Sequence, residues 1–164
     1  MIVLGIDPSL TSTGFCVLEQ GRLDKKVLYS GIITTKASEP LNQRIRDIYA
    51  GIAHIAKLFK LELMVIEKPY INSNAQTSIK LANLYGALLL LSAQQNIELL
   101  ELAPSTIKKL ISWNGRADKD LVAESIKHFV EFEPSTESFD ETDAVAVALA
   151  GIHEIKKIKI LSIT

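Results

Sequence analysis

The sequence of 164 residues has a single cysteine and no excess of charge of either sign. Cys16 alone excludes an intrachain disulfide and a thiolate metal cluster. Because it lies in an apolar stretch, we expect it to pack in the core. Eighteen Lys and Arg against nineteen Asp and Glu leave a formal charge of −1, so no overall basic field indicates nucleic acid. This overall balance is still compatible with a local basic patch.

Long apolar runs are also absent. No run reaches about 18 residues, which argues against a membrane-spanning helix, and the N-terminus lacks the pattern of a signal peptide. We therefore expect no membrane association and a location in the cytoplasm. The composition, 48% hydrophobic and 23% charged, is typical of a globular protein, and no repeat or change in composition divides it. We expect one domain over residues 1–164.

The most informative stretch is at the N-terminus. Residues 1–18 indicate a buried strand, a tight turn and a second strand, and Asp7 stands where the first apolar run ends and Pro8 stops the strand. The short hydroxyl side chains that follow, together with Gly14, leave room for a phosphate-bearing ligand. Asp7 on its own is equally compatible with a residue that caps its own turn.

The rest of the chain alternates between strand and helix patterns. Further strands are expected over 27–35, 63–66 and 97–102, and helices over 41–59, 76–94, 104–112, 119–130 and from about 139 to 152. Ser138 and Glu141 have the spacing of a capping box for the last helix. We predict an α/β protein with a five-stranded mixed sheet, antiparallel in its first three strands, parallel in the remainder and flanked by helices. The first strand would be central.

Four acids can be gathered at one edge of such a sheet. Asp7 and Glu67 each follow an apolar strand, and Asp140 and Asp143, three residues apart, share one face of the last helix. Acids at a helix start also interact favourably with its dipole, but Asp143 lies beyond the first turn on an apolar face and needs a partner. Clustered carboxylates repel one another, which predicts a hard divalent cation, Mg²⁺ or Mn²⁺. Two such ions can promote phosphodiester hydrolysis.

Several segments carry a resemblance to a known family. The sequence resembles RuvC-type Holliday junction resolvases, members of the RNase H-like and retroviral-integrase superfamily. The matching segments are GIDPSLTSTGF (5–15), YSGIITT (29–35), LMVIEKPYINSNAQTSIKLANLYGAL (63–88), APSTIKK (103–109) with Lys119, and FDETDAVAVALA (139–150). They span nearly the whole chain.

The resemblance implies an RNase H-like fold and a Mg²⁺-dependent endonuclease with two ions per site, in which Mn²⁺ substitutes. Such an enzyme acts as a homodimer and makes paired nicks in four-way DNA junctions during recombination and repair, where a branch-migration machinery is a possible partner. The implied catalytic acids and metal ligands are Asp7, Glu67, Asp140 and Asp143. Lys108 and Lys119 would lie beside the scissile phosphate, and Tyr70 would stack on an unpaired base.

In the family, the helix that follows the Glu67 loop makes the dimer contact, which agrees with the nearly all-round apolar segment 84–91. We expect the dimer contact to include the helix around Leu84, Leu88 and Leu91. Three alternatives remain open at this point. These are a divergent, phage-like relative that cuts several branched DNAs, a junction-binding protein that does not cut, and an actin-like or sugar-kinase ATPase, whose phosphate hairpin also has an apolar strand ending in Gly-Ile-Asp.

Overall fold

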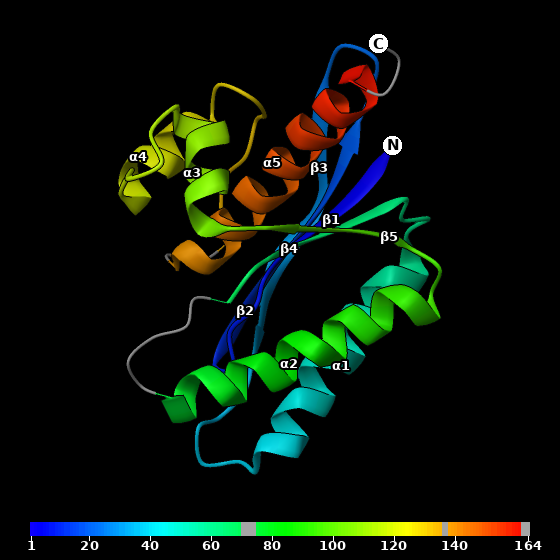
Figure 1. Ribbon diagram of the computed structural model, residues 1–164, viewed down its shortest axis with the longest axis vertical. Helices are drawn as coiled ribbons and strands as arrows, with labels where there is room; N and C mark the ends of the chain where they lie inside the picture. Colours follow the sequence, from blue (N-terminus) through cyan, green and yellow to red (C-terminus); the bar gives the residue numbers. More distant parts are fainter. Residues whose placement is uncertain (70–74, 136–137, 162–164) are drawn as a thin grey trace.

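The protein has one five-stranded sheet with helices on both faces. The computed structural model describes residues 1–69, 75–135 and 138–161 (Figure 1). The strands are β1 (Ile2–Asp7), β2 (Ser12–Gln20), β3 (Lys25–Thr34), β4 (Leu63–Glu67) and β5 (Glu98–Leu102). The helices are α1 (Leu41–Leu58), α2 (Ala75–Gln94), α3 (Pro104–Ser112), α4 (Lys119–Ile126) and α5 (Phe139–Leu161).

The sheet has the strand order β3-β2-β1-β4-β5, with β1 in the centre. β1 pairs antiparallel with β2, and β2 with β3, whereas β1 pairs parallel with β4, and β4 with β5. The predicted mixed sheet, its antiparallel first three strands and its central first strand are therefore confirmed. No helix of the described residues is long and apolar enough to cross a membrane.

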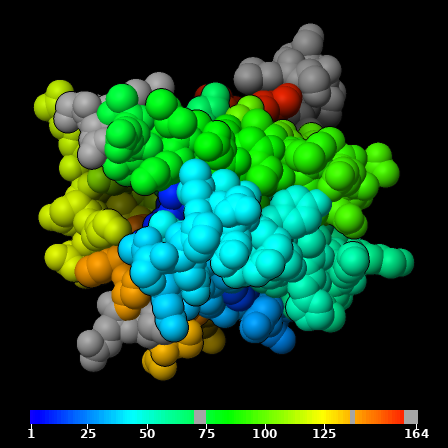
Figure 2. All heavy atoms as spheres, turned by 90° about the horizontal axis from the view of Figure 1, so that it is seen from below, coloured from blue at the N-terminus to red at the C-terminus, as the bar shows by residue number. Residues whose placement is uncertain are grey.

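Two helical layers bury both faces of the sheet. α1 and α2 cover one face, where they lie side by side, and α3, α4 and α5 cover the other (Figures 1 and 2). Successive side chains of β1 enter opposite layers, since Val3 packs with α5 and Leu4 with α1 and α2. This double burial explains the uninterrupted apolar runs of β1 and β4. Cys16 is fully buried, as predicted, and burial raises the pKa of its thiol.

Two glycines allow α5 to lie directly on the backbone of the sheet. A Cβ atom at Gly5 would lie 2.5 Å from the carbonyl oxygen of Ala144, and one at Gly14 would lie 1.9 Å from the carbonyl oxygen of Asp140. Real side chains do not approach so closely, so any larger residue at either position must displace the helix. Gly14 also pairs with Asp7 across β1 and β2. The first turn of α5 is thereby held against the end of β1.

Two helices end at residues other than those predicted. α4 ends at Ile126 instead of about 130, because residues 127–129 continue as tight turns and Val130 is buried in the core. His128 consequently follows the helix instead of lying within it. α5 continues to Leu161, well beyond the predicted end near 152.

The apolar segment of α2 is positioned differently from our expectation. Leu84, Leu88 and Leu91 are fully buried in the core between α1, α2 and the sheet, so the prediction that they form a dimer contact is wrong. A segment that is apolar nearly all round does not reveal which side faces its own sheet. The exposed apolar side chains of this helix are Ile79 and Leu90.

Candidate active site

The four predicted acids come from three elements that meet at one edge of the sheet. Asp7 is the last residue of β1 and Glu67 the last of β4, and the two strands run parallel with Ile6 opposite Ile66. Parallel neighbours end at the same edge, so their terminal acids emerge together. Asp140 and Asp143 lie in the first turns of α5, which packs on β1 and β2.

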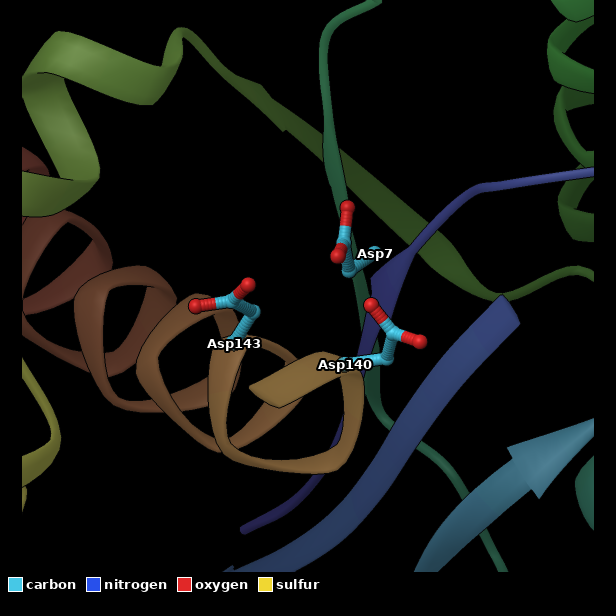
Figure 3. Close-up of side chains that lie close together, drawn as sticks. All are labelled: Asp7, Asp140 and Asp143. Carbon is cyan, nitrogen blue, oxygen red and sulfur yellow. The ribbon is translucent and has the colours of Figure 1, made fainter. Parts of the chain in front are cut away.

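Three carboxylates form a compact cluster. One oxygen from each of Asp7, Asp140 and Asp143 lies within 4.8 Å of the others, and Figure 3 shows the two α5 carboxylates on the side of the helix that faces Asp7. Glu67 is not in this group. It lines a cavity of about 380 Å³ together with Asp7, Asp143, Lys108 and Lys119. Asp7 and Asp143 thus belong both to the carboxylate cluster and to the cavity lining. Asp140 belongs to the cluster alone, and Glu67 to the cavity lining alone.

The site disfavours negative charge on two of its acids. Burial, and then the carboxylates of Asp143 and Asp140, raise the pKa of Asp7 to about 7, although Lys119 acts in the opposite direction. Burial, Asp7 and Asp143 raise the pKa of Glu67 to about 8, against the effects of Lys108 and Lys119. The two lysines therefore do not provide enough positive charge to offset burial and repulsion and return the pKa values of these acids to their ordinary range.

The two predicted lysines both face the acid cavity. The Nζ atom of Lys119 lies 2.7 Å from Oδ2 of Asp143 and 5.7 Å from the centre of the Phe139 ring. Burial lowers the pKa of Lys119, but the hydrogen bond to Asp143 and the neighbouring acids outweigh this effect and the net shift is upward. Lys108 lines the same cavity from α3. Tyr70, the predicted stacking residue, lies outside the described residues.

The residues present fit a hard divalent cation. The cluster offers only carboxylate oxygens, which Mg²⁺ and Mn²⁺ prefer over thiolate or imidazole ligands. Among the residues that the structure describes, no histidine or cysteine is part of such a group. A cation held by Asp7, Asp140 and Asp143 would reverse the effect that raises the pKa of Asp7. Glu67 would reach the same region from β4.

The turn after Asp7 uses its hydroxyl groups for its own structure. Thr13 is fully buried, and its Oγ1 donates a hydrogen bond of 2.5 Å to the carbonyl oxygen of Ser9. Arg44 of α1, which is largely buried, donates to the carbonyl oxygen of Leu10 at 2.7 Å and to Oγ1 of Thr35 at 2.9 Å. Arg44 could not be predicted from the sequence, because one arginine on an amphipathic helix gives no signal of burial.

Glu141 has a different role from the one its spacing predicts. Its carboxylate is buried, and it accepts hydrogen bonds from Oγ of Ser30 at 2.7 Å and from the backbone N–H and Oγ of Ser135 at 2.9 and 2.7 Å. The predicted part of Glu141 in a capping box is wrong, because these donors occupy its carboxylate, but Ser138 does cap the start of α5. Ser138 exchanges hydrogen bonds with Asp140, whose backbone N–H donates to Oγ of Ser138. Glu141 therefore ties the start of α5 to β3.

A central strand that ends in an aspartate, with carboxylates from the adjacent parallel strand and from a helix across the sheet, is the arrangement that the resemblance to RNase H-like nucleases implies. The family model described as crossover junction endodeoxyribonuclease RuvC matches residues 3–151. The chain belongs to the RuvC family.

Individual relatives agree with this assignment. The crossover junction endodeoxyribonuclease RuvC of Rickettsia conorii is 34% identical over 148 residues, which cover 90% of this chain and 94% of that protein. The solved structure of Thermus thermophilus RuvC in complex with a Holliday junction substrate has a TM-score of 0.83 at 24% identity, with 92% of each chain covered. The yeast mitochondrial Holliday junction resolvase has a TM-score of 0.65 at 16% identity, covering 90% of this chain and 75% of its own. These structures confirm the predicted fold.

Proposed function

We propose that this protein is a metal-dependent endonuclease that resolves four-way DNA junctions in recombination and repair, with residues 1–164 as one nuclease domain in the cytoplasm. The observation that carries the proposal is the gathering of Asp7, Asp140 and Asp143 within 4.8 Å in a member of the RuvC family. The names of its relatives support four-way junctions as substrate. A two-lobed ATPase is not favoured, since the described residues form a single sheet.

The acids would hold two Mg²⁺ ions, for which Mn²⁺ substitutes. Asp7 and Asp143 are suited to serve both ions, because they belong both to the compact cluster and to the cavity that Glu67 lines. Bound ions supply the charge that activates water and stabilises the leaving oxygen of a phosphodiester. Lys108 and Lys119 would neutralise the phosphate that enters the cavity. Tyr70 would stack on a base at the junction centre.

A labelled four-way junction, incubated with and without Mg²⁺, tests this function. We expect nicks at symmetric positions in two opposed strands with Mg²⁺ and intact DNA in its absence. A linear duplex of the same sequence is the control and should stay uncut. A three-way junction and a flap measure how far the enzyme accepts other branched DNA. A complex that forms but releases no nicked strand with Mg²⁺ or Mn²⁺ would show a binding protein, and consumption of ATP would show the alternative enzyme.

The protein would act as a homodimer, because one chain offers one acid cluster among its described residues and paired nicks require two. We place the contact on the exposed face of α2 instead of its buried leucines. Ile79 and Leu90 are 61% and 55% exposed, and a Cβ at Gly86 would meet nothing within 4 Å. The spacing of these residues puts them along one stripe of the helix. A second copy would cover this stripe, and a branch-migration machinery remains a further candidate partner.

Leu90→Glu should convert the dimer into folded monomers, because it places a charge in the proposed contact without touching the core. Sedimentation velocity at micromolar concentration measures the change, and circular dichroism checks the fold. Leu58→Glu is the matched control, since Leu58 is a 60% exposed side chain on α1, and it should leave the dimer intact. A wild-type protein that sediments as a monomer would contradict the proposed dimer.

A further inference from the structure

A second groove lies on the opposite side of α3 from the acid cavity. It has a volume of about 520 Å³, and Lys109, Leu110, Trp113 and Lys157 are among its lining residues. Consecutive residues of α3 separate the two hollows, because Lys108 lines the acid cavity and Lys109 lines this groove. An α-helix with its side chains is about 10 Å across, so the groove and the acid cavity are neighbours on the surface.

Trp113 combines two features that are unfavourable in the free protein. Its side chain is 87% exposed, and its backbone has a left-handed conformation with φ 59° and ψ 6° at the end of α3. Glycine is the usual residue at such a helix end, and a bulky residue there is strained. Asn96 is the other non-glycine residue with a positive φ in the described part of the chain, and asparagine tolerates this conformation. Neither burial nor local geometry accounts for a tryptophan here.

The charge around this indole is positive. Lys109 and Lys157 are exposed lining residues, and exposed Arg116 follows in the same turn region. Glu154 is the one acidic residue among the lining side chains. The whole chain, in contrast, has a formal charge of −1. An anionic ligand with flat faces or apolar edges fits a surface that combines cations with an exposed aromatic ring, and nucleic acid has both properties.

We propose that this groove is a second DNA-binding surface, which holds the duplex arm adjoining the strand that is cut. The lysines and Arg116 would contact phosphates, and the indole of Trp113 would lie against deoxyribose or base edges. The major groove of DNA alone is about 12 Å wide, so a duplex that delivers a phosphate to the acid cavity also extends across α3. This inference rests on the proposed function.

Trp113 is the only tryptophan of the chain, so its fluorescence reports on this groove alone. A labelled four-way junction is titrated without divalent cations, so that it is bound but not cut. Anisotropy of the label measures binding, and quenching of tryptophan emission by acrylamide measures access to the indole. Acrylamide is neutral, and the charge of the DNA therefore does not repel it. We expect the quenching constant to fall by about twofold or more at saturation, as expected for an aromatic ring covered by DNA.

Trp113→Gly tests the energetic contribution. Glycine accepts the left-handed conformation, so the variant should fold with unchanged or higher thermal stability. We expect its affinity for the junction to fall about tenfold, because the variant loses the apolar area that the indole would bury against the DNA. Lys109→Ala should lower the slope of log affinity against log salt by about one. Leu58→Ala is the control, because Leu58 is 60% exposed on α1, which covers the opposite face of the sheet from α3, and it should leave affinity unchanged.

The outcomes separate this inference from the proposed function. Anisotropy that shows full binding, with an indole still open to acrylamide and wild-type affinity for Trp113→Gly, would overturn the second surface and leave the nuclease proposal intact. Anisotropy that shows no junction binding would overturn both. Shielding of the indole together with weakened binding of Trp113→Gly is the result we expect.

Discussion

Asp7→Asn is expected to reduce Mg²⁺-dependent cleavage of a four-way junction by about a thousandfold or more, since the loss of about 4 kcal/mol of metal-dependent stabilisation has this effect on a rate. Asparagine keeps the shape of the side chain and removes its charge, at one of the two residues that both acid sets share. Single-turnover cleavage of a labelled junction measures the rate. Glu67→Gln, Asp140→Asn and Asp143→Asn should lower it in the same way.

Binding and a distant acid provide the controls for this result. Junction affinity, measured by gel shift, should change little, because contacts to the DNA backbone contribute most of it. Asp47→Asn removes a 45% exposed carboxylate from α1, on the opposite face of the sheet from α5, and should cut at the wild-type rate. Near-normal nicking by Asp7→Asn would rule out the assignment of Asp7 as a metal ligand.

The same substitution is expected to stabilise the protein when no metal is bound. The pKa of Asp7 is about 7 in the folded chain, well above the ordinary value of about 3.9 that it takes when unfolded. Between these values the folded state binds more protons than the unfolded state, so this carboxyl lowers the free energy of unfolding as pH rises from about 4 to about 7. Asp7→Asn has no carboxyl to ionise at this position, so its free energy of unfolding does not fall in this way as pH rises. Its advantage over wild type should be small at pH 4 and reach a few kcal/mol at pH 8, at about 1.4 kcal/mol per pKa unit.

Thermal unfolding in EDTA across this pH range measures the difference between the two proteins. We expect Asp7→Asn to melt about 5 °C or more above wild type at pH 8, given about 2–4 °C per kcal/mol for a chain of this size. Mg²⁺ should then raise the melting temperature of wild type, and much less that of the variant. Asp47→Asn, the exposed acid on α1, should follow the wild-type curve. A variant that melts below wild type at pH 8 in EDTA would show that the site does not disfavour the Asp7 charge.

The sheet and its acids could be predicted from the sequence because the relevant signals are local. β1 and β4 are buried on both faces and read as apolar runs, and each run ends in an acid. Asp140 and Asp143 share a helix face whatever the helix packs against. Asp7 and Glu67 emerge at the same edge once β1 and β4 are parallel neighbours. The order of strands and helices along the chain was therefore enough to predict that the acids lie at one edge of the sheet.

The errors concern contacts between distant segments. Glu141 has the spacing of a capping residue, but its actual partner on β3 is Ser30, which lies 111 residues earlier in the chain. α2 is apolar on nearly every side, and only the packed structure distinguishes buried Leu88 from exposed Leu90. In the sequence, Trp113 precedes Asn114 and Gly115, a pattern that predicts only the end of a helix. Its left-handed backbone and its exposure are seen only in the folded structure.

The contact between Gly14 and the first turn of α5 has a consequence for local opening of the protein. Gly14 pairs with Asp7 and leaves no space between its Cα and the carbonyl group of Asp140, so neither β1, β2 nor the start of α5 can shift alone. The paired amide hydrogens of β1 and β2, and those of α5 beyond its first turn, should therefore exchange with solvent deuterium at one common, slow rate, through opening of the whole domain. The carboxylates of Asp7 and Asp140 would then keep their spacing while substrate binds and leaves.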